Sequence, residues 1–208
     1  MQSAPIIGLG RHRLSVDGKG VTTLVAFHGC TLHCHYCLNS SCLMPSGVWR
    51  KVTTEELLEE VRIDNLYFVA TGGGITFGGG EPCLRSLFIE EFAGMMPQEW
   101  NITIETCLNV ERQHVERLLP IVSQWIIDVK DMNREIYKAY TGKSNKRTID
   151  NLRWLLRHEG MAERIIVRLP HIPEYNTDED VKQSRQLLKD MGITTFDEFD
   201  YITDRKAP

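Results

Sequence analysis

Short apolar runs alternate with segments of helical period along most of this chain. The runs are rich in β-branched and aromatic residues, so together the two kinds of segment predict repeated β/α units around a mainly parallel sheet. The expected strands are residues 22–28, 75–77, 101–105, 125–129, 164–169 and 196–199. At ~30 residues per unit, six units need about 180 residues, so a chain of 208 residues favours an open, partial (β/α)6 barrel of TIM type over a closed barrel.

The expected helices begin at readable signals. Thr53 and Glu56 have the spacing of a capping box, and Thr177 is followed by three acidic residues that suit a first helical turn. Further helices are expected over residues 84–95, 110–118 and 148–158. We expect a single domain over residues 1–208, with 1–20 as an N-terminal extension and 203–208 as a fraying tail.

The charge and hydropathy of the chain exclude several classes of partner. The net charge is -4 and the pI is about 6.0, with no run of Lys and Arg, so nucleic acid is not an expected partner. No apolar run approaches the ~18 residues that cross a bilayer, and the first residues lack the order of a signal peptide. We therefore expect a monomeric cytoplasmic protein that does not bind membranes.

Three thiols, Cys30, Cys34 and Cys37, follow the first expected strand within eight residues. In a chain without an export signal, clustered cysteines indicate metal binding or chemistry more than disulfide bonds. A cubic four-iron cluster normally takes four thiolates, so a loop that offers three holds the cluster and leaves one iron open to another molecule. An open coordination position is the mark of a reactive metal site.

Two other interpretations of this loop remain open at the level of residues. A zinc ion would need a fourth ligand, for which the candidates are Cys42, His33 and His35. Structural zinc sites usually join two separated ligand pairs, however, whereas these candidates lie in one loop. A thioredoxin-like redox pair of Cys34 and Cys37 leaves Cys30 unexplained.

The remaining thiols show no such spacing. Cys42, Cys83 and Cys107 have no partner at a ligand-like distance in the sequence. We interpret them as packed or incidental thiols.

Other polar residues follow the later strands, where chemistry gathers in barrels of this kind. The glycines before Glu81 lack the ending of a phosphate-binding loop and offer bare backbone that suits a charged amine. Asp128 and Lys130 share one face of their strand, and buried charges need partners. We expect them to form an ion pair or to bind a zwitterion such as an amino-acid head group. Glu105 and Thr106 add a carboxylate and a hydroxyl at the neighbouring strand end.

The motifs together resemble a known family. The spacing C-x3-C-x-aromatic-C, with Tyr36 as the aromatic residue, is the signature of radical S-adenosylmethionine enzymes. More narrowly, the resemblance is to the glycyl-radical-enzyme activating enzymes, of which pyruvate formate-lyase activating enzyme is one, and it spans nearly the whole chain. The segments that carry it are residues 15–20, 79–82, 128–130 and 142–145.

The resemblance implies a function, cofactors and partners. Cys30, Cys34 and Cys37 would hold a [4Fe-4S] cluster whose open iron chelates S-adenosylmethionine. One electron from a flavodoxin or ferredoxin would cleave the sulfonium, and the resulting 5'-deoxyadenosyl radical would take hydrogen from a backbone glycine of a partner glycyl-radical enzyme. The residues implied to contact S-adenosylmethionine are Tyr36, Gly79, Gly80, Glu81, Glu105, Thr106, Asp128 and Lys130. Asp17 is implied to lie near the incoming glycine peptide.

At several positions the sequence departs from the family pattern, and this limits which features of the family are expected in this chain. Lys19 stands where a proline is usual, and Glu105 stands where aspartate is common, so a monovalent cation site of relatives could differ here. Tyr201 is followed by Ile202 and not by the histidine that often contacts the ribose. Two alternative functions stay open: radical chemistry on a small molecule or peptide, and a zinc-stabilised binding module without catalysis.

Overall fold

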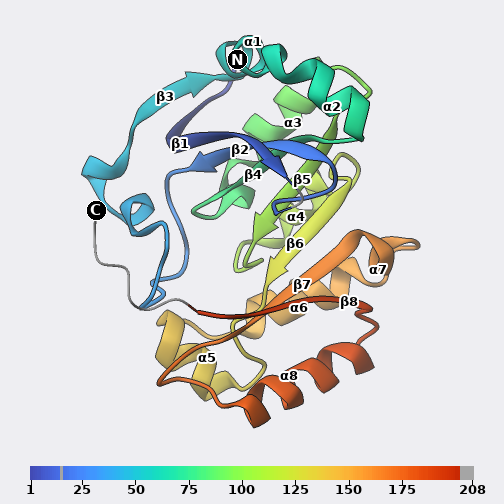
Figure 1. The fold of residues 1–208 in the computed structure, drawn as a ribbon. Coiled ribbons are helices and arrows are strands. Elements are labelled where there is room, and N and C mark those ends of the chain that lie inside the picture. Colours follow the sequence, from blue (N-terminus) through green and yellow to red (C-terminus); the bar gives the residue numbers. More distant parts are fainter. Residues whose placement is uncertain (15, 202–208) are drawn as a thin grey trace.

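A curved eight-stranded sheet forms the centre of the computed structural model, which describes residues 1–14 and 16–201 (Figure 1). The strands lie in the order β3-β1-β2-β4-β5-β6-β7-β8, and Figure 1 shows them as an open arc with helices along its outer side. The strands are β1 Ser3–Leu14, β2 Val21–Phe27, β3 Arg50–Thr53, β4 Gly74–Gly79, β5 Asn101–Thr106, β6 Gln124–Asp128, β7 Ile165–His171 and β8 Thr195–Asp200.

The six strands β2 and β4 to β8 run parallel, each paired with the next. They coincide with the six expected strands to within two residues or so at each end, which confirms the expected open α/β barrel. The central strands are buried along nearly their whole length, as in β2, because layers cover both faces of the sheet. A strand that is buried on both faces consists almost entirely of apolar residues, and for this reason the strand can be recognised in the sequence.

The helices cover the sheet, and five of the eight described α-helices lie where the sequence indicates. The eight are α1 Thr54–Val61, α2 Asn65–Thr71, α3 Ser86–Met95, α4 Arg112–Leu118, α5 Arg134–Thr141, α6 Lys146–Leu155, α7 Met161–Arg164 and α8 Asp178–Asp190, with 3-10 turns at Ser40–Leu43, Pro45–Gly47, Arg62–Asp64 and Pro82–Arg85. Thr53 and Glu56 form the expected capping box at α1, and Thr177 and Asp180 form one at α8. The sequence did not predict α2, α5 or α7.

The first strand is the main difference from the sequence-based expectation. Residues 1–20 were expected as an extension, but β1 pairs antiparallel with both β2 and β3 and so belongs to the sheet. The register between β1 and β2 shifts between Ile6 and Gly8 and again between Gly10 and Arg13. Such irregularities break the alternation that identifies a strand from sequence. The expected tail at 203–208 lies outside the described residues.

The hydrophobic core lies between the sheet and its helices. Its aromatic centre joins β2, β4 and α3, where the Phe27 and Phe77 rings stack with centroids 5.4 Å apart and Phe92 meets Phe77 edge-on at 5.6 Å. Among the described helices, none has the length and apolar character that crossing a membrane requires. Polar residues lie on the concave side of the arc.

Candidate functional site

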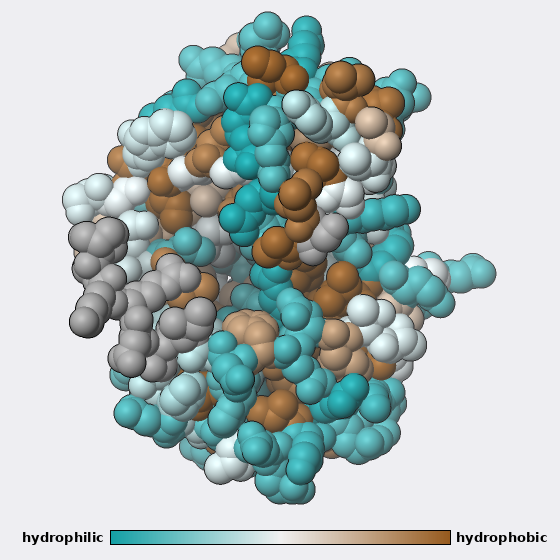
Figure 2. Space-filling model, in the orientation of Figure 1, coloured by the Kyte–Doolittle hydropathy of each residue, from teal (hydrophilic) through white to brown (hydrophobic). Residues whose placement is uncertain are grey.

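A cavity of about 580 Å³ opens on the concave side of the sheet. Figure 2 shows the surface hollowed between the part of the molecule that carries β1 to β4 and the part that carries β7 and α5. Among the residues expected at a site, those that line the cavity are Asp17, Cys30, Cys34, Cys37, Gly79, Gly80, Glu105, Asp128 and Lys130. Most of them follow or end parallel strands, so the carboxyl edge of the sheet brings them together.

The cysteine loop joins β2 to the first 3-10 turn and is fastened on two sides. The backbone N–H of Gly29 donates to the carbonyl of Cys42 at 2.9 Å, and that of His33 donates to the carbonyl of Thr141 at 3.0 Å. On its inner side the loop packs Cys30 and Cys34 against a small buried cluster that contains Leu32, Cys107 and Tyr137. The loop is therefore held between the 3-10 turn Ser40–Leu43 and the C-terminus of α5.

Two further thiols contact the three of the motif. The neighbouring Cys107 thiol lowers the pKa of the Cys30 thiol, and the neighbouring Cys42 thiol lowers the pKa of Cys37 to about 6. Cys42 and Cys107 are buried, in agreement with their interpretation as packed thiols. They are not incidental, however, because each lies beside a thiol of the motif. Only Cys83 fits that interpretation fully, because its fully buried thiol hydrogen bonds to a threonine hydroxyl away from the motif.

Cys34 lies in a different environment from the other two. Burial raises the pKa of its thiol to about 12, against the attraction of the nearby Lys130 ammonium. Cys34 also packs between two buried clusters, one that contains Tyr137 and one that contains Tyr140. Of the three motif thiols it is the one most enclosed by the protein.

The donor set fits a multi-iron cluster better than a single ion. Among the described residues, no three His, Cys, Asp or Glu side chains stand at the spacing that holds one metal ion, which disfavours a closed zinc site. In an iron–sulfur cube each thiolate binds a different iron, so three separated thiols on one wall suit it. Cys107 also lines the cavity, but its thiol donates to Glu81 at 2.9 Å and is not free to be a fourth ligand.

Asp128 and Lys130 form the expected ion pair, with Nζ and Oδ2 3.2 Å apart. The lysine is almost fully buried, and burial acts most strongly to lower its pKa, but Asp128 together with Tyr201, Cys34 and Tyr140 raises the pKa well above its usual value. Its ammonium also lies 5.6 Å from the ring centroid of Tyr201. The pair offers a fixed positive and a fixed negative charge to a ligand in the cavity.

Arg168 is the functional residue that the sequence reasoning missed. It projects from β7 into the cavity, where its guanidinium lies 2.8 Å from Glu105, 3.2 Å from Asp197 and 4.0 Å from Asp17. The signal was present in the sequence, because Arg168 is a charged residue with apolar residues on both sides inside an expected strand. It also supplies the Glu105 carboxylate with a positively charged partner.

The pKa of Glu105 is subject to opposing effects. Burial, together with the nearby negative charges of Asp17 and Asp128, raises its pKa to about 7, although Arg168 acts to lower it. Glu105 therefore changes its charge near neutral pH while it faces the cavity.

Three of the expected contact residues do not line the cavity. Glu81 is buried behind the wall, where its carboxylate accepts hydrogen bonds from the Thr106 hydroxyl at 2.7 Å and from the Cys107 backbone at 2.9 Å. Thr106 is buried with it. Tyr36 points to a group of tyrosines that includes Tyr140 and donates its hydroxyl to a glutamate outside the cavity. In this structure Glu81 and Thr106 brace the loop after β5.

Gly79 and Gly80 lie where β4 approaches the end of β2. The φ angle of Gly79 is 88°, and a Cβ there would lie 2.7 Å from the Cα of Ala26; a Cβ on Gly80 would lie 2.2 Å from the carbonyl oxygen of Gly29. Side chains at these positions would therefore displace the start of the cysteine loop. The close approach explains the glycines structurally and leaves their backbone exposed to the cavity.

The fold is an open parallel α/β barrel, and its carboxyl edge carries a three-cysteine loop beside a buried ion pair. These features together indicate a barrel protein that binds a metal cofactor. Residues 24–188 match the family model described as the radical SAM superfamily. The chain belongs to the radical SAM superfamily, in the group of the glycyl-radical-enzyme activating enzymes. The cofactors of that superfamily, a [4Fe-4S] cluster and S-adenosylmethionine, are the ones that this site has to accommodate.

Named relatives place the chain within the superfamily. It is 30% identical over 185 residues to pyruvate formate-lyase 1-activating enzyme of Escherichia coli K12, covering 86% of this chain and 72% of that protein. It is 35% identical over 165 residues to (2S)-3-sulfopropanediol dehydratase activating enzyme of Klebsiella oxytoca, covering 77% of this chain. The match spans only half the length of that second relative.

Solved structures share the fold at low sequence identity. SuiB of Streptococcus suis bound to S-adenosylmethionine superposes with a TM-score of 0.64 at 15% identity, covering 88% of this chain and 43% of that chain. The structure titled native anSMEcpe with bound AdoMet superposes with a TM-score of 0.57 at 19% identity, covering 86% and 52%. These likenesses confirm the open barrel.

Proposed function

We propose that this chain activates a glycyl-radical enzyme: it binds a [4Fe-4S] cluster and S-adenosylmethionine and removes a hydrogen atom from a backbone glycine of a partner protein. The observation that carries the proposal is the convergence of Cys30, Cys34 and Cys37 on one cavity with the Asp128–Lys130 pair. The relatives named as activating enzymes support it. When bound, the two cofactors supply one-electron cleavage of a carbon–sulfur bond.

The residues of the chain hold and orient the ligands in this proposal. The three motif thiols bind the cluster, and the Lys130 ammonium lies near the Cys34 thiol. The backbone of Gly79 and Gly80 and the Asp128–Lys130 pair bind the amino-acid part of S-adenosylmethionine, whose charges they complement. Glu105 accepts hydrogen bonds from hydroxyl groups of the same ligand.

The partner glycine reaches the same cavity. Asp17 is 3% exposed and is held by Arg13, so its carboxylate is fixed at the cavity wall. In the proposal Asp17 lies beside the incoming glycine peptide. An acidic electron carrier such as flavodoxin or ferredoxin supplies the electron. The reaction proceeds without oxygen, in the cytoplasm, with the activating enzyme as a monomer.

Electron spin resonance tests the proposal. The anaerobically reduced protein, mixed with S-adenosylmethionine and the glycyl-radical enzyme encoded nearby, should produce a glycyl doublet. Cleavage of S-adenosylmethionine without a doublet would favour a small-molecule or peptide substrate. Stoichiometric zinc without iron or sulfide in anaerobically purified protein would contradict radical chemistry altogether.

The pKa of Glu105 predicts a pH dependence of cofactor binding. At pH 8 this carboxylate is ionised and accepts hydrogen bonds; as the pH falls through about 7 it takes up a proton and loses that capacity. A ligand that requires the ionised form then loses affinity by up to about tenfold per pH unit below 7. Equilibrium dialysis of S-adenosylmethionine from pH 6 to 8.5 measures this loss.

The Glu105→Gln variant should bind more weakly at pH 8 and show little pH dependence between 6 and 8. Glu116→Gln, an exposed change on α4, serves as the control and should follow the wild-type curve. If Glu105→Gln kept the wild-type pH profile, another group would be responsible.

A further inference from the structure

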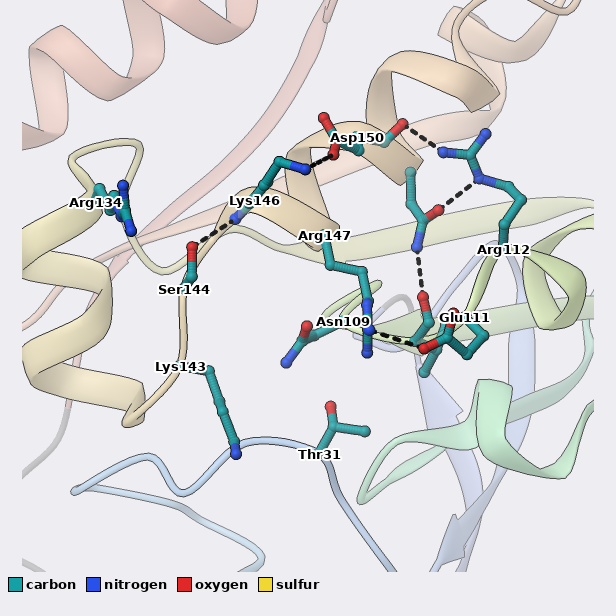
Figure 3. A pocket seen from close by; sticks show the side chains of 12 residues that line it. Thr31, Asn109, Glu111, Arg112, Arg134, Lys143, Ser144, Lys146, Arg147 and Asp150 are labelled. Atoms are coloured by element: carbon teal, nitrogen blue, oxygen red, sulfur yellow. Dashed lines mark hydrogen bonds and ion pairs between the residues drawn. The ribbon is translucent and has the colours of Figure 1, made fainter.

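A second cavity, of about 870 Å³, lies behind the cysteine loop (Figure 3). It is bounded by the loop after β5, the start of α4, the start of α5 and the start of α6. Thr31 lines it, whereas the preceding residue Cys30 lines the cofactor cavity. The cysteine loop therefore separates the two cavities, and one face of the loop belongs to each.

The wall between this second cavity and the motif is a packed contact. The Thr31 hydroxyl lies 3.9 Å from the thiol of Cys107, and Cys30 packs against the buried cluster that contains Cys107. The backbone of His33 donates to the carbonyl of Thr141 at the end of α5, which fixes the loop to the elements that carry the cavity. This wall therefore connects the second cavity to the motif without crossing the cofactor cavity.

The second cavity is basic, although the chain as a whole has a net charge of -4. Five basic and two acidic side chains line it: Arg112, Arg134, Lys143, Lys146 and Arg147, with Glu111 and Asp150. Electrostatic complementarity to an acidic protein raises the rate of encounter and fixes its orientation. The cavity therefore suits a negatively charged partner.

The arrangement of these charges favours a protein surface over one small anion. Arg147 pairs with Glu111 at 2.8 Å and Lys146 with Asp150 at 3.6 Å, so their charges are partly compensated. Arg134 and Lys143 are exposed and take part in no ion pair among the described residues. Figure 3 shows them apart from each other on the same side of the cavity, across from Arg112, with Lys143 extending toward the loop of Thr31. Because these two positive charges lie apart at the rim of the cavity, they create an extended positive potential and do not form a site for a single phosphate.

We propose that this basic cavity is the docking surface for an acidic one-electron carrier protein that reduces the cluster. The inference rests on the proposed function, in which the cofactor cavity is shared by S-adenosylmethionine and the partner glycine, so that the carrier requires another face of the cysteine loop. In the step, one electron leaves the reduced carrier and enters the cluster, and no bond of this chain forms or breaks. Docking beside Thr31 brings the carrier to the back of Cys30.

The test reverses the two unpaired charges. The double variant Arg134→Glu/Lys143→Glu is compared with Arg157→Glu/Lys189→Glu, which makes the same charge change at exposed positions outside the cavity. Binding of oxidised flavodoxin and of oxidised ferredoxin to the anaerobically purified proteins is measured by calorimetry. The cavity variant should bind a carrier at least about tenfold more weakly than the control, and wild-type binding should weaken as salt screens the charges.

Measuring S-adenosylmethionine cleavage with two different reductants distinguishes an effect on carrier docking from an effect on the cleavage reaction. With reduced flavodoxin at limiting concentration, formation of 5'-deoxyadenosine should fall at least about tenfold in the cavity variant. With dithionite, which needs no docking, the rate should equal that of the control variant. Equal carrier binding in the two variants would overturn the inference, as would a parallel loss with dithionite.

Other outcomes are equally decisive. Saturable binding of inorganic phosphate that is lost in the cavity variant, with no binding of either carrier, would assign the cavity to a small anion. Absence of 5'-deoxyadenosine from the wild type under dithionite would instead contradict the proposed function, and the calorimetric comparison would still decide the docking surface.

Discussion

Replacing Cys34 by alanine is expected to remove S-adenosylmethionine cleavage while leaving the fold intact. Cys34 is the most enclosed motif thiol and lies beside the Lys130 ammonium. Ligands of one cluster act as a unit, and the loss of one should lower the rate of 5'-deoxyadenosine formation by roughly a thousandfold or more. Iron and sulfide content, measured after anaerobic purification, should fall with it.

Cys83→Ala is the matched control for that variant. Cys83 is fully buried in the core but contacts no motif thiol, and its hydrogen bond to Thr106 is 3.4 Å long. Its loss should cost about 1 kcal/mol of stability and leave the iron content unchanged. Circular dichroism of both variants should match the wild type. Equal cleavage rates in Cys34→Ala and Cys83→Ala would contradict the assignment of the cluster ligands.

The fold was predictable because its strands are buried on both faces. A strand such as β6, with Trp125 to Ile127 fully enclosed, has an apolar sequence whatever its neighbours are. The strand ends then place the polar residues that follow them along one edge of the sheet. For that reason Cys30, Gly79, Glu105 and Asp128 could be expected together before their distances were known.

Contacts between distant segments were not predictable in the same way. Arg168 meets Glu105 and Asp17 because β7 and the loop after β1 face one cavity, which no spacing in the sequence records. Cys107 reaches Cys30 for the same reason, across the sheet from β5 to the loop after β2. The basic cavity combines the starts of three helices, and each of its charges alone resembles an ordinary surface residue.

Lys130→Met is expected to separate cofactor binding from cluster binding. The lysine is 6% exposed and neutralises Asp128 at 3.2 Å, so its loss leaves a carboxylate at the cavity wall beside the acidic Glu105. Truncating one member of an enclosed charge pair typically costs about 2 kcal/mol or more in binding. The dissociation constant of S-adenosylmethionine should therefore rise by about thirtyfold or more.

The three thiols are retained in this variant, so its iron content should stay close to that of the wild type, in contrast to Cys34→Ala. Methionine has nearly the length of lysine without its charge, which limits the change to electrostatics. Lys182→Met, an exposed change on α8, is the control and should bind S-adenosylmethionine as the wild type does. Equilibrium dialysis gives the affinities. Wild-type affinity in Lys130→Met would show that the ion pair supports the wall of the cavity without contacting the ligand, because a buried charge that bound the ligand could not be removed without loss.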